Sequence, residues 1–214
     1  ILQNTASTPT KTYVLTNSTT ASSNGTAIVI DLSTTDFNAV IDIAGGGLAT
    51  ALSDSFITMT AAAITDMAAT PNNLTALTTG VQAASWTANT VAATNFRVTT
   101  STGATSSTMT AGATKAITIR TYDASGYRSP SYAGTGASAK TLAFSGAANS
   151  PDANVPTARN KDNTDINFAS NTTVDFTNGE GTSTLRLYNR QTALIKATDA
   201  ANSVTTLDAY ALTI

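Results

Sequence analysis

The chain of 214 residues contains neither cysteine nor histidine, and only 11% of its residues are charged. Without cysteine there are no disulfide bonds, so stability must come from burial and hydrogen bonding. Without histidine, the commonest general base and zinc ligand are missing, and no ordinary Ser-His-Asp triad can form. The net charge of −2 and the pI near 4.8 argue against nucleic-acid binding, which needs a basic face. We therefore expect neither an enzyme nor a nucleic-acid partner.

Long apolar runs are also missing. Three aspartates interrupt the stretch Ile28–Ala44, and no run approaches the roughly 18 uninterrupted apolar residues of a membrane span. The sequence begins at Ile1 and shows no leader. Together with a composition rich in serine, threonine and asparagine, this predicts an exported protein, extracellular or at the cell surface, whose leader has been removed. A proteolytic fragment is the alternative.

Threonine, alanine and serine take the place of the missing charge. Threonine is stiff at χ1 and packs well on a pleated surface, so this composition favours sheet. Lys115–Tyr122 alternates apolar and polar residues, and Asn178–Gly181 separates two such runs with a hairpin signal. Asn149–Asn167 reads as a long surface loop. Further strands are expected at Thr141–Ser145, Thr173–Thr177, Thr182–Tyr188, Ala193–Thr198 and Thr206–Ile214, a number and spacing that predict a two-sheet sandwich.

An ordered series of short motifs runs through the second half of the chain. The motifs are Ala111-Gly112, Ile117–Gly126, Ser131–Gly134, Lys140–Gly146, Phe176–Gly179, Thr184–Tyr188 and Ile195–Asp199. In this order they resemble the bacterial immunoglobulin-like (Big-type) repeats of surface and secreted proteins, over about residues 98–214. The resemblance implies an immunoglobulin-like β-sandwich with a role as an extracellular spacer, in adhesion or in assembly. It carries no catalytic residues.

The first half predicts a second β-rich domain, residues 13–97, of uncertain topology. Strands are expected at Thr12–Leu15, Ala27–Leu32, Phe37–Ile43 and Phe56–Ile64, although the alanine-rich stretch Leu48–Met67 could instead hold one helix. The expected fold class is therefore all-β, with two β-sandwich-like domains, the C-terminal one immunoglobulin-like. The boundary is expected near residues 95–103, and residues 1–12 form an N-terminal extension.

Charge is divided unevenly between the two halves. Up to residue 96 there is one basic residue and there are five acids, which gives −4; from residue 97 there are ten basic residues and eight acids, which gives +2. Drift in surface composition between domains explains this pattern. The alternative is that faces of opposite sign order head-to-tail contacts between copies.

The two ends of the chain are the expected places of assembly. The first residues carry few large apolar side chains and end at Pro9; such a tail is disordered, packs on its own domain, or adds a strand to a neighbour's sheet edge. The terminal strand Leu207–Ile214 is a candidate open edge. The residues expected to make assembly contacts are Ile1, Leu2, Tyr13, Leu207, Tyr210, Leu212 and Ile214.

Few residues suggest a ligand. Asp162, Asp165 and Asn167 place oxygen ligands within six residues, which suits calcium, although the spacing lacks the glycine and distal glutamate of an EF-hand. Asx-turns are the usual role of such residues. Tyrosines at 122, 127 and 132 fit core packing or loop anchoring better than a sugar-binding platform. Sequons that would permit N-glycosylation begin at Asn17, Asn24, Asn73 and Asn171.

These features together predict a structural subunit of an extracellular filament, sheath or surface layer, which assembles with copies of itself through β-edges and polar faces. Charged side chains on an edge strand hinder unwanted pairing with other strands, and this chain has few of them. A neighbouring copy that covers the edge would protect it instead. The alternative is an adhesin or carbohydrate-binding spacer fragment of a larger surface protein, with glycans or other surface proteins as partners.

Overall fold

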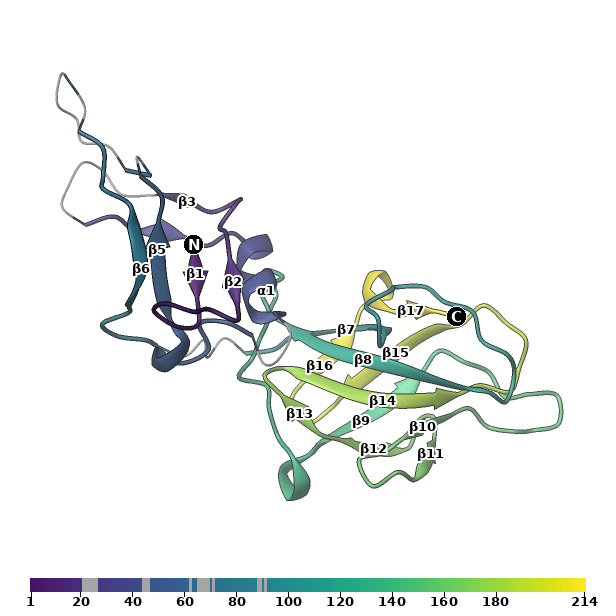
Figure 1. Ribbon diagram of the computed structural model, residues 1–214. Helices are drawn as coiled ribbons and strands as arrows, with labels where there is room; N and C mark the ends of the chain where they lie inside the picture. The colour runs from purple at the N-terminus through teal and green to yellow at the C-terminus, as the bar shows by residue number, and fades with distance from the viewer. Residues whose placement is uncertain are drawn as a thin grey trace. The chain divides into compact units, whose positions relative to one another are not determined.

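The computed structural model of the chain describes residues 1–20, 27–43, 47–61, 63–64, 70, 72–87, 90 and 92–214. The chain divides into two compact units, Ile1–Ala88 and Asn89–Ile214. Strands are the main regular elements of both units, and the described residues include one α-helix, so the predicted all-β class is confirmed (Figure 1). The division precedes the expected boundary, because residues 95–100 form a strand of the C-terminal unit.

The N-terminal unit contains one small antiparallel sheet in the order β2-β1-β5-β6. Its strands are β1 (Leu2–Gln3), β2 (Thr12–Tyr13), β5 (Phe56–Met59) and β6 (Leu77–Gln82). A separate pair joins β3 (Thr19–Thr20) to β4 (Ile30–Asp31), and a 3₁₀ turn, η1, spans Leu52–Asp54. Within the described ranges this unit is therefore a small sheet accompanied by a helix, and two packed sheets are not seen in it.

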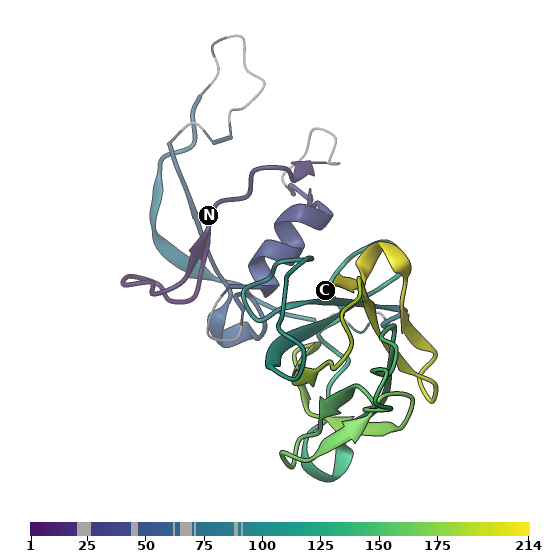
Figure 2. The same ribbon diagram turned by 90° about the vertical axis from the view of Figure 1, so that its right-hand side faces the viewer.

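Helix α1 (Thr34–Ile41) replaces the strand expected at Phe37–Ile43. The side chain of Ser33 caps the helix by accepting a hydrogen bond from the backbone N–H of Asp36, at 3.1 Å. Asp36 and Val40, one turn apart, are the buried residues of the helix, which lies beside β2 (Figures 1 and 2). Alternating apolar residues over so short a stretch also fit a helix. A helix of eight residues buries only one side, here through Asp36 and Val40. A helix was also considered within Leu48–Met67, where the described residues form η1 and β5 instead.

The first residues of the chain pack on their own unit. Strand β1 lies between β2 and β5, with Leu2 opposite both Tyr13 and Ile57. The backbone N–H of Thr58 also donates to the carbonyl of Ile1, at 2.9 Å. Residues 1–12 are therefore no free extension here, and donating them to a neighbour would first require removing a central strand.

The C-terminal unit contains a single strongly curved sheet in the order β11-β10-β14-β8-β7-β16-β15-β9-β12. Along this order, neighbours pair antiparallel except β7 and β16, whose parallel pairing joins the two halves of the sheet. The strands are β7 (Asn95–Thr100), β8 (Thr114–Tyr122), β9 (Lys140–Ser145), β10 (Thr157–Arg159), β11 (Asp165–Asn167), β12 (Asn171–Val174), β13 (Phe176–Thr177), β14 (Glu180–Arg186), β15 (Leu194–Asp199), β16 (Val204–Thr206) and β17 (Leu212–Thr213). Short 3₁₀ turns are η2 (Gly136–Ser138) and η3 (Asp208–Tyr210).

One hydrophobic core lies between the two halves of this sheet. Strands β7, β8, β9, β14 and β15 all contribute side chains to it, and β8 contributes Ile117 and Ile119. The ring of Tyr132 packs edge-on against Phe96 and Phe176, with centroids 5.6 and 5.0 Å apart. Such a core stabilises the unit without disulfide bonds.

The hairpin predicted at Asn178–Gly181 is confirmed, with a turn shorter than expected. Strands β13 and β14 pair with Thr177 opposite Glu180, so the connection is a two-residue turn. Asn178 and Gly179 have φ angles of 50° and 71°, the positive values that such a turn requires.

Two other sequence predictions for the C-terminal unit were wrong. The expected loop Asn149–Asn167 includes β10 and β11, which form a hairpin because Asn160 Oδ1 accepts hydrogen bonds from the backbone of Asp162 and Thr164. The expected single strand Thr206–Ile214 is divided into the end of β16, η3 and β17.

We predict that Gly146→Ala costs the C-terminal unit about 3 kcal/mol of unfolding free energy, measured by urea denaturation. Gly146 has φ of +101°, and an added Cβ would overlap the carbonyl oxygen of Leu194 on β15. Gly112→Ala is the matched control: φ is +79°, but the new Cβ would meet no atom within 4 Å, so about 1 kcal/mol is expected. Equal losses in the two variants would contradict this explanation.

Candidate functional site

Exposed apolar side chains are concentrated in the N-terminal unit. Among the described residues, eight of the ten exposed large hydrophobic side chains lie there: Ile1, Val14, Ile28, Val29, Ile30, Leu52, Val81 and Trp86. Within the described ranges the same unit buries only Val40 and Leu48, whereas the C-terminal unit buries twenty apolar residues. The N-terminal unit therefore exposes to water large apolar side chains of the kind that the C-terminal unit buries.

The most continuous part of this surface is the segment Ile28–Asp31. Its three aliphatic side chains are 46%, 56% and 43% exposed. Asp31 is exposed as well, and no cation in the described part of the chain forms an ion pair with it. The segment thus combines consecutive apolar side chains with one free carboxylate.

Strand β6 is the edge of the N-terminal sheet opposite β2. Its sequence, Leu77–Gln82, contains no charged residue, and Val81 is 54% exposed. One backbone group of β6 is already hydrogen-bonded within the unit, since the N–H of Gly80 donates to the carbonyl of Ala6, at 2.7 Å. Edges without charge are the ones that accept another strand most readily.

The edges of the C-terminal sheet are better protected. Strand β11 carries Asp165, whose carboxylate accepts a hydrogen bond from Arg159 Nε at 2.8 Å. On β12, the carbonyl of Thr173 accepts from the backbone N–H of Lys161, also at 2.8 Å. Strand β12 is uncharged as well, but its exposed residue, Asn171, is polar, whereas β6 exposes Val81, so assembly through an uncharged edge with an apolar side chain points to β6.

The terminal strand is not the open edge that the sequence suggested. Leu212 is fully buried, and β17 pairs with β15 on one side. On its other side, Thr213 exchanges backbone hydrogen bonds with Thr105 and Ser107. Both borders of β17 are therefore occupied within the unit. Of the neighbouring candidates, Leu207 is exposed, Ile214 is half-buried beside the core, and the ring of Tyr210 lies 4.4 Å from the guanidinium of Arg97.

Tyr13, a predicted assembly residue, has an internal role. Its hydroxyl donates to the carboxylate of Asp36, at 2.9 Å. The same carboxylate accepts from Ser18 Oγ at 2.6 Å and from the backbone N–H groups of Thr16 and Asn17. Burial alone would raise the pKa of Asp36, but these hydrogen bonds outweigh it and hold the pKa far below its usual range.

Sequence reasoning treated Asp36 only as an interruption of an apolar run. The signal that would have revealed its place is Ser33, three residues earlier, because serine in that position is typical of a helix N-cap. The carboxylate ties the chain after β2 to the start of α1, which makes it a structural group of the N-terminal unit.

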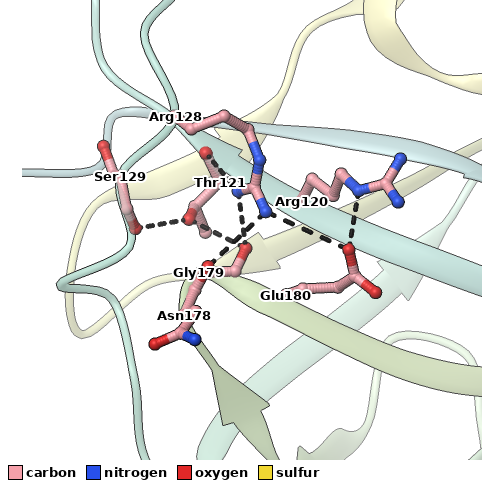
Figure 3. Close-up of polar contacts among 7 residues, drawn as sticks. All are labelled: Arg120, Thr121, Arg128, Ser129, Asn178, Gly179 and Glu180. Atoms are coloured by element: carbon pink, nitrogen blue, oxygen red, sulfur yellow. Dashed lines mark hydrogen bonds and ion pairs between the residues drawn. The ribbon is translucent and has the colours of Figure 1, made fainter. Parts of the chain in front are cut away.

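A second polar cluster surrounds Arg128 in the C-terminal unit (Figure 3). The Arg128 side chain is only 2% exposed, and its guanidinium donates to the carbonyl oxygens of Thr121 and Gly179, both at 3.1 Å. Glu180, at the start of β14, accepts from Arg120 Nε at 2.7 Å. The cluster fastens the loop after β8 to the β13–β14 hairpin. The order of the residues in sequence gave no sign of it.

The three residues proposed as calcium ligands lie on one hairpin, and the two carboxylates among them are engaged by basic side chains. Asp162 Oδ1 accepts from Lys161 Nζ at 2.8 Å, Asp165 is engaged by Arg159, and Asn167 pairs with Thr157 at the end of β11. In the portion of the chain that the structure describes, no three acidic side chains gather as a metal site would require.

The other predicted positions are distributed over the surface and the core. Asn17, Asn73 and Asn171 are exposed, and Asn24 lies outside the described residues. Tyr132 is buried and donates its hydroxyl to Asp199, at 2.5 Å, which agrees with its predicted packing role. Tyr122 is buried beneath the guanidinium of Arg97, at 3.9 Å. Two of the three tyrosines are therefore not part of an exposed platform.

Comparison with protein-family models, with curated proteins and with solved structures found no match to this chain. None of the helices in the described ranges is both long enough and apolar enough to cross a bilayer. The geometry of the two units is thus the basis for assigning a role, and its main feature is the uncovered apolar surface of the N-terminal unit.

Proposed function

We propose that this protein is a structural subunit that assembles with copies of itself into an extracellular filament, sheath or surface layer. One observation carries the proposal: the N-terminal unit exposes eight large apolar side chains and buries two among its described residues. A unit of this size gains little stability from so small a core, so covering its surface is strongly favourable.

The chemistry of the surface supports a copy of the chain as the covering partner. The units carry opposite net charge, and β6 offers an uncharged edge on which a strand can add. Hydroxyl and amide groups dominate the rest of the surface, because only 11% of residues are charged. Such surfaces resist association less than strongly charged ones do.

The strand order of the C-terminal unit supports the proposed relation to immunoglobulin-like surface repeats. Strands β10-β14-β8-β7 correspond to one sheet of such a sandwich, and β16-β15-β9-β12 correspond to the other. We propose that this unit is the rigid spacer of the subunit and that, like such repeats, it works outside the cell.

Assembly itself is the first test of this function. At increasing concentration, the purified chain is expected to sediment as species much larger than 21.7 kDa and to form regular filaments or sheets in electron micrographs. A single compact 21.7 kDa species at every concentration under native conditions would contradict the proposal.

The contribution of β6 is tested by Val81→Lys, which places a charge on the open edge. We expect this variant to raise the concentration needed for assembly about tenfold or more, measured by sedimentation velocity. Leu194→Lys is the matched control, since Leu194 is also exposed but lies on β15, which pairs on both sides within the other unit. Equal inhibition by both substitutions would show a general effect of charge and no specific role of the edge.

A second candidate is a spacer module of a larger adhesive protein. It is favoured by the self-contained core of the C-terminal unit and by the protected edges β11 and β12. A chain with this role would remain monomeric and would bind surfaces or glycans through another part, so a glycan array together with sedimentation distinguishes the two candidates.

A further inference from the structure

A hollow of about 350 Å³ opens at one end of the C-terminal unit. Its apolar lining is formed by Met109, Ala111, Leu187 and Ile214, of which Met109 and Ile214 are half-buried side chains packed against the core. The rest of the lining is polar: Thr108, Asn189, Arg190 and Gln191. Gln191 stiffens one wall, because its side-chain amide exchanges hydrogen bonds with the backbone of Ala148, at 3.0 and 3.3 Å. The hollow is large enough for one or two aliphatic side chains.

Arg190 lines this hollow, and among the described residues it has no carboxylate as an ion-pair partner. Its side chain is exposed. By contrast, Arg120, Arg159, Lys161 and Lys196 each have a carboxylate partner. A hollow with a partly apolar lining and one cation favours a group that combines apolar side chains with a negative charge.

The segment Ile28–Asp31 of the N-terminal unit has this chemistry. It presents three consecutive exposed aliphatic side chains followed by the unpaired carboxylate of Asp31. The unit that carries it has a net charge of −4, and the unit that carries the hollow has +2, counted as one base and five acids against ten bases and eight acids. Long-range and local charge therefore favour the same contact.

We propose that the Ile28–Asp31 segment of one copy docks into the Arg190 hollow of a second copy, with Asp31 paired to Arg190. This inference rests on the proposed function and names a second contact between copies, which we call the joint, besides the edge of β6. The two surfaces differ, so the contact is heterologous: each copy offers one segment and one hollow. Contacts of this kind continue from copy to copy. They give a filament whose two ends differ, unless the rotation between neighbouring copies closes a ring.

Charge reversal tests the joint. Arg190→Glu alone and Asp31→Arg alone are each expected to weaken assembly about tenfold or more, because each brings like charges together. A 1:1 mixture of the two single variants is expected to assemble again. In the mixture, the acidic side chain introduced at position 190 of one variant meets the basic side chain introduced at position 31 of the other. The native Asp31 of the first variant likewise meets the native Arg190 of the second.

Recovery in the mixture, measured by sedimentation velocity, separates this joint from its alternatives. A chain that carries both Arg190→Glu and Asp31→Arg is measured beside the mixture. If this double variant recovers wild-type assembly and the mixture does not, the contact lies within one chain and the inference is overturned. Lys115→Glu changes the charge of the C-terminal unit by the same amount and serves as the control, with little effect expected.

The apolar part of the joint is tested by Ile30→Ser. It removes one aliphatic side chain without altering charge and is expected to weaken assembly several-fold. If the wild-type chain assembles but none of these variants changes its assembly, this joint is wrong while the proposed function stands. If the wild-type chain never assembles, the proposed function itself fails.

Discussion

Replacing Arg128 with alanine is expected to lower the unfolding free energy of the C-terminal unit by about 3 kcal/mol. The guanidinium is buried and donates to the carbonyls of Thr121 and Gly179, with that of Asn178 3.5 Å away. Alanine leaves these oxygens without donors where water does not reach, and it also leaves a cavity. Loss of the buried charge offsets part of this cost.

Urea denaturation followed by near-ultraviolet circular dichroism would measure this effect, because five of the six tyrosines lie in the C-terminal unit. Arg120→Ala is the matched control. Its ion pair with Glu180 involves side chains that are 28% and 38% exposed, so about 1 kcal/mol or less is expected. Losses of similar size in the two variants would contradict the role assigned to Arg128.

Acid is expected to loosen the N-terminal unit through Asp36. The hydrogen bonds from Ser18, Thr16, Asn17 and Tyr13 depress the pKa of this carboxyl in the folded chain. In the unfolded chain the pKa returns to about 3.9. The stability that the depressed pKa provides is therefore fully present above about pH 4 and is lost as the pH falls from there toward the folded pKa.

Trp86 reports this transition, because it is the only tryptophan and its indole N–H donates to the carbonyl of Ala49 within the same unit. Asp36→Asn is expected to weaken the unit at neutral pH, since the amide cannot accept all of these hydrogen bonds, and to flatten the pH dependence below about pH 4. Asp31→Asn, at an exposed position, is the control at concentrations where the chain is monomeric. A wild-type acid transition that persists unchanged in Asp36→Asn would exclude Asp36 as its origin.

The elements that the sequence predicted well are those whose information is local. Strand β8 follows from alternation along Lys115–Tyr122, and the β13–β14 hairpin follows from Asn178-Gly179, since few other residues adopt positive φ. Helix α1 was missed because seven residues with alternating apolar side chains also fit a short helix, and the deciding group was the cap at Ser33.

The sites depended on contacts between distant residues. Arg128 lies 51 positions from Gly179, and Asp36 lies 18 positions from Ser18. No local pattern marks either pair. The same limit applies to the terminal strand: its composition suggested an edge, but the backbone of residues 105–107 pairs with it.

By itself, the sequence determined the all-β class, the lack of disulfide bonds and the opposite charge of the two halves, because composition and short-range periodicity fix these properties. Only the tertiary structure decided which apolar side chains are covered. Burial depends on which strands become neighbours, and in this chain it left the N-terminal unit exposed while the C-terminal unit closed around its core.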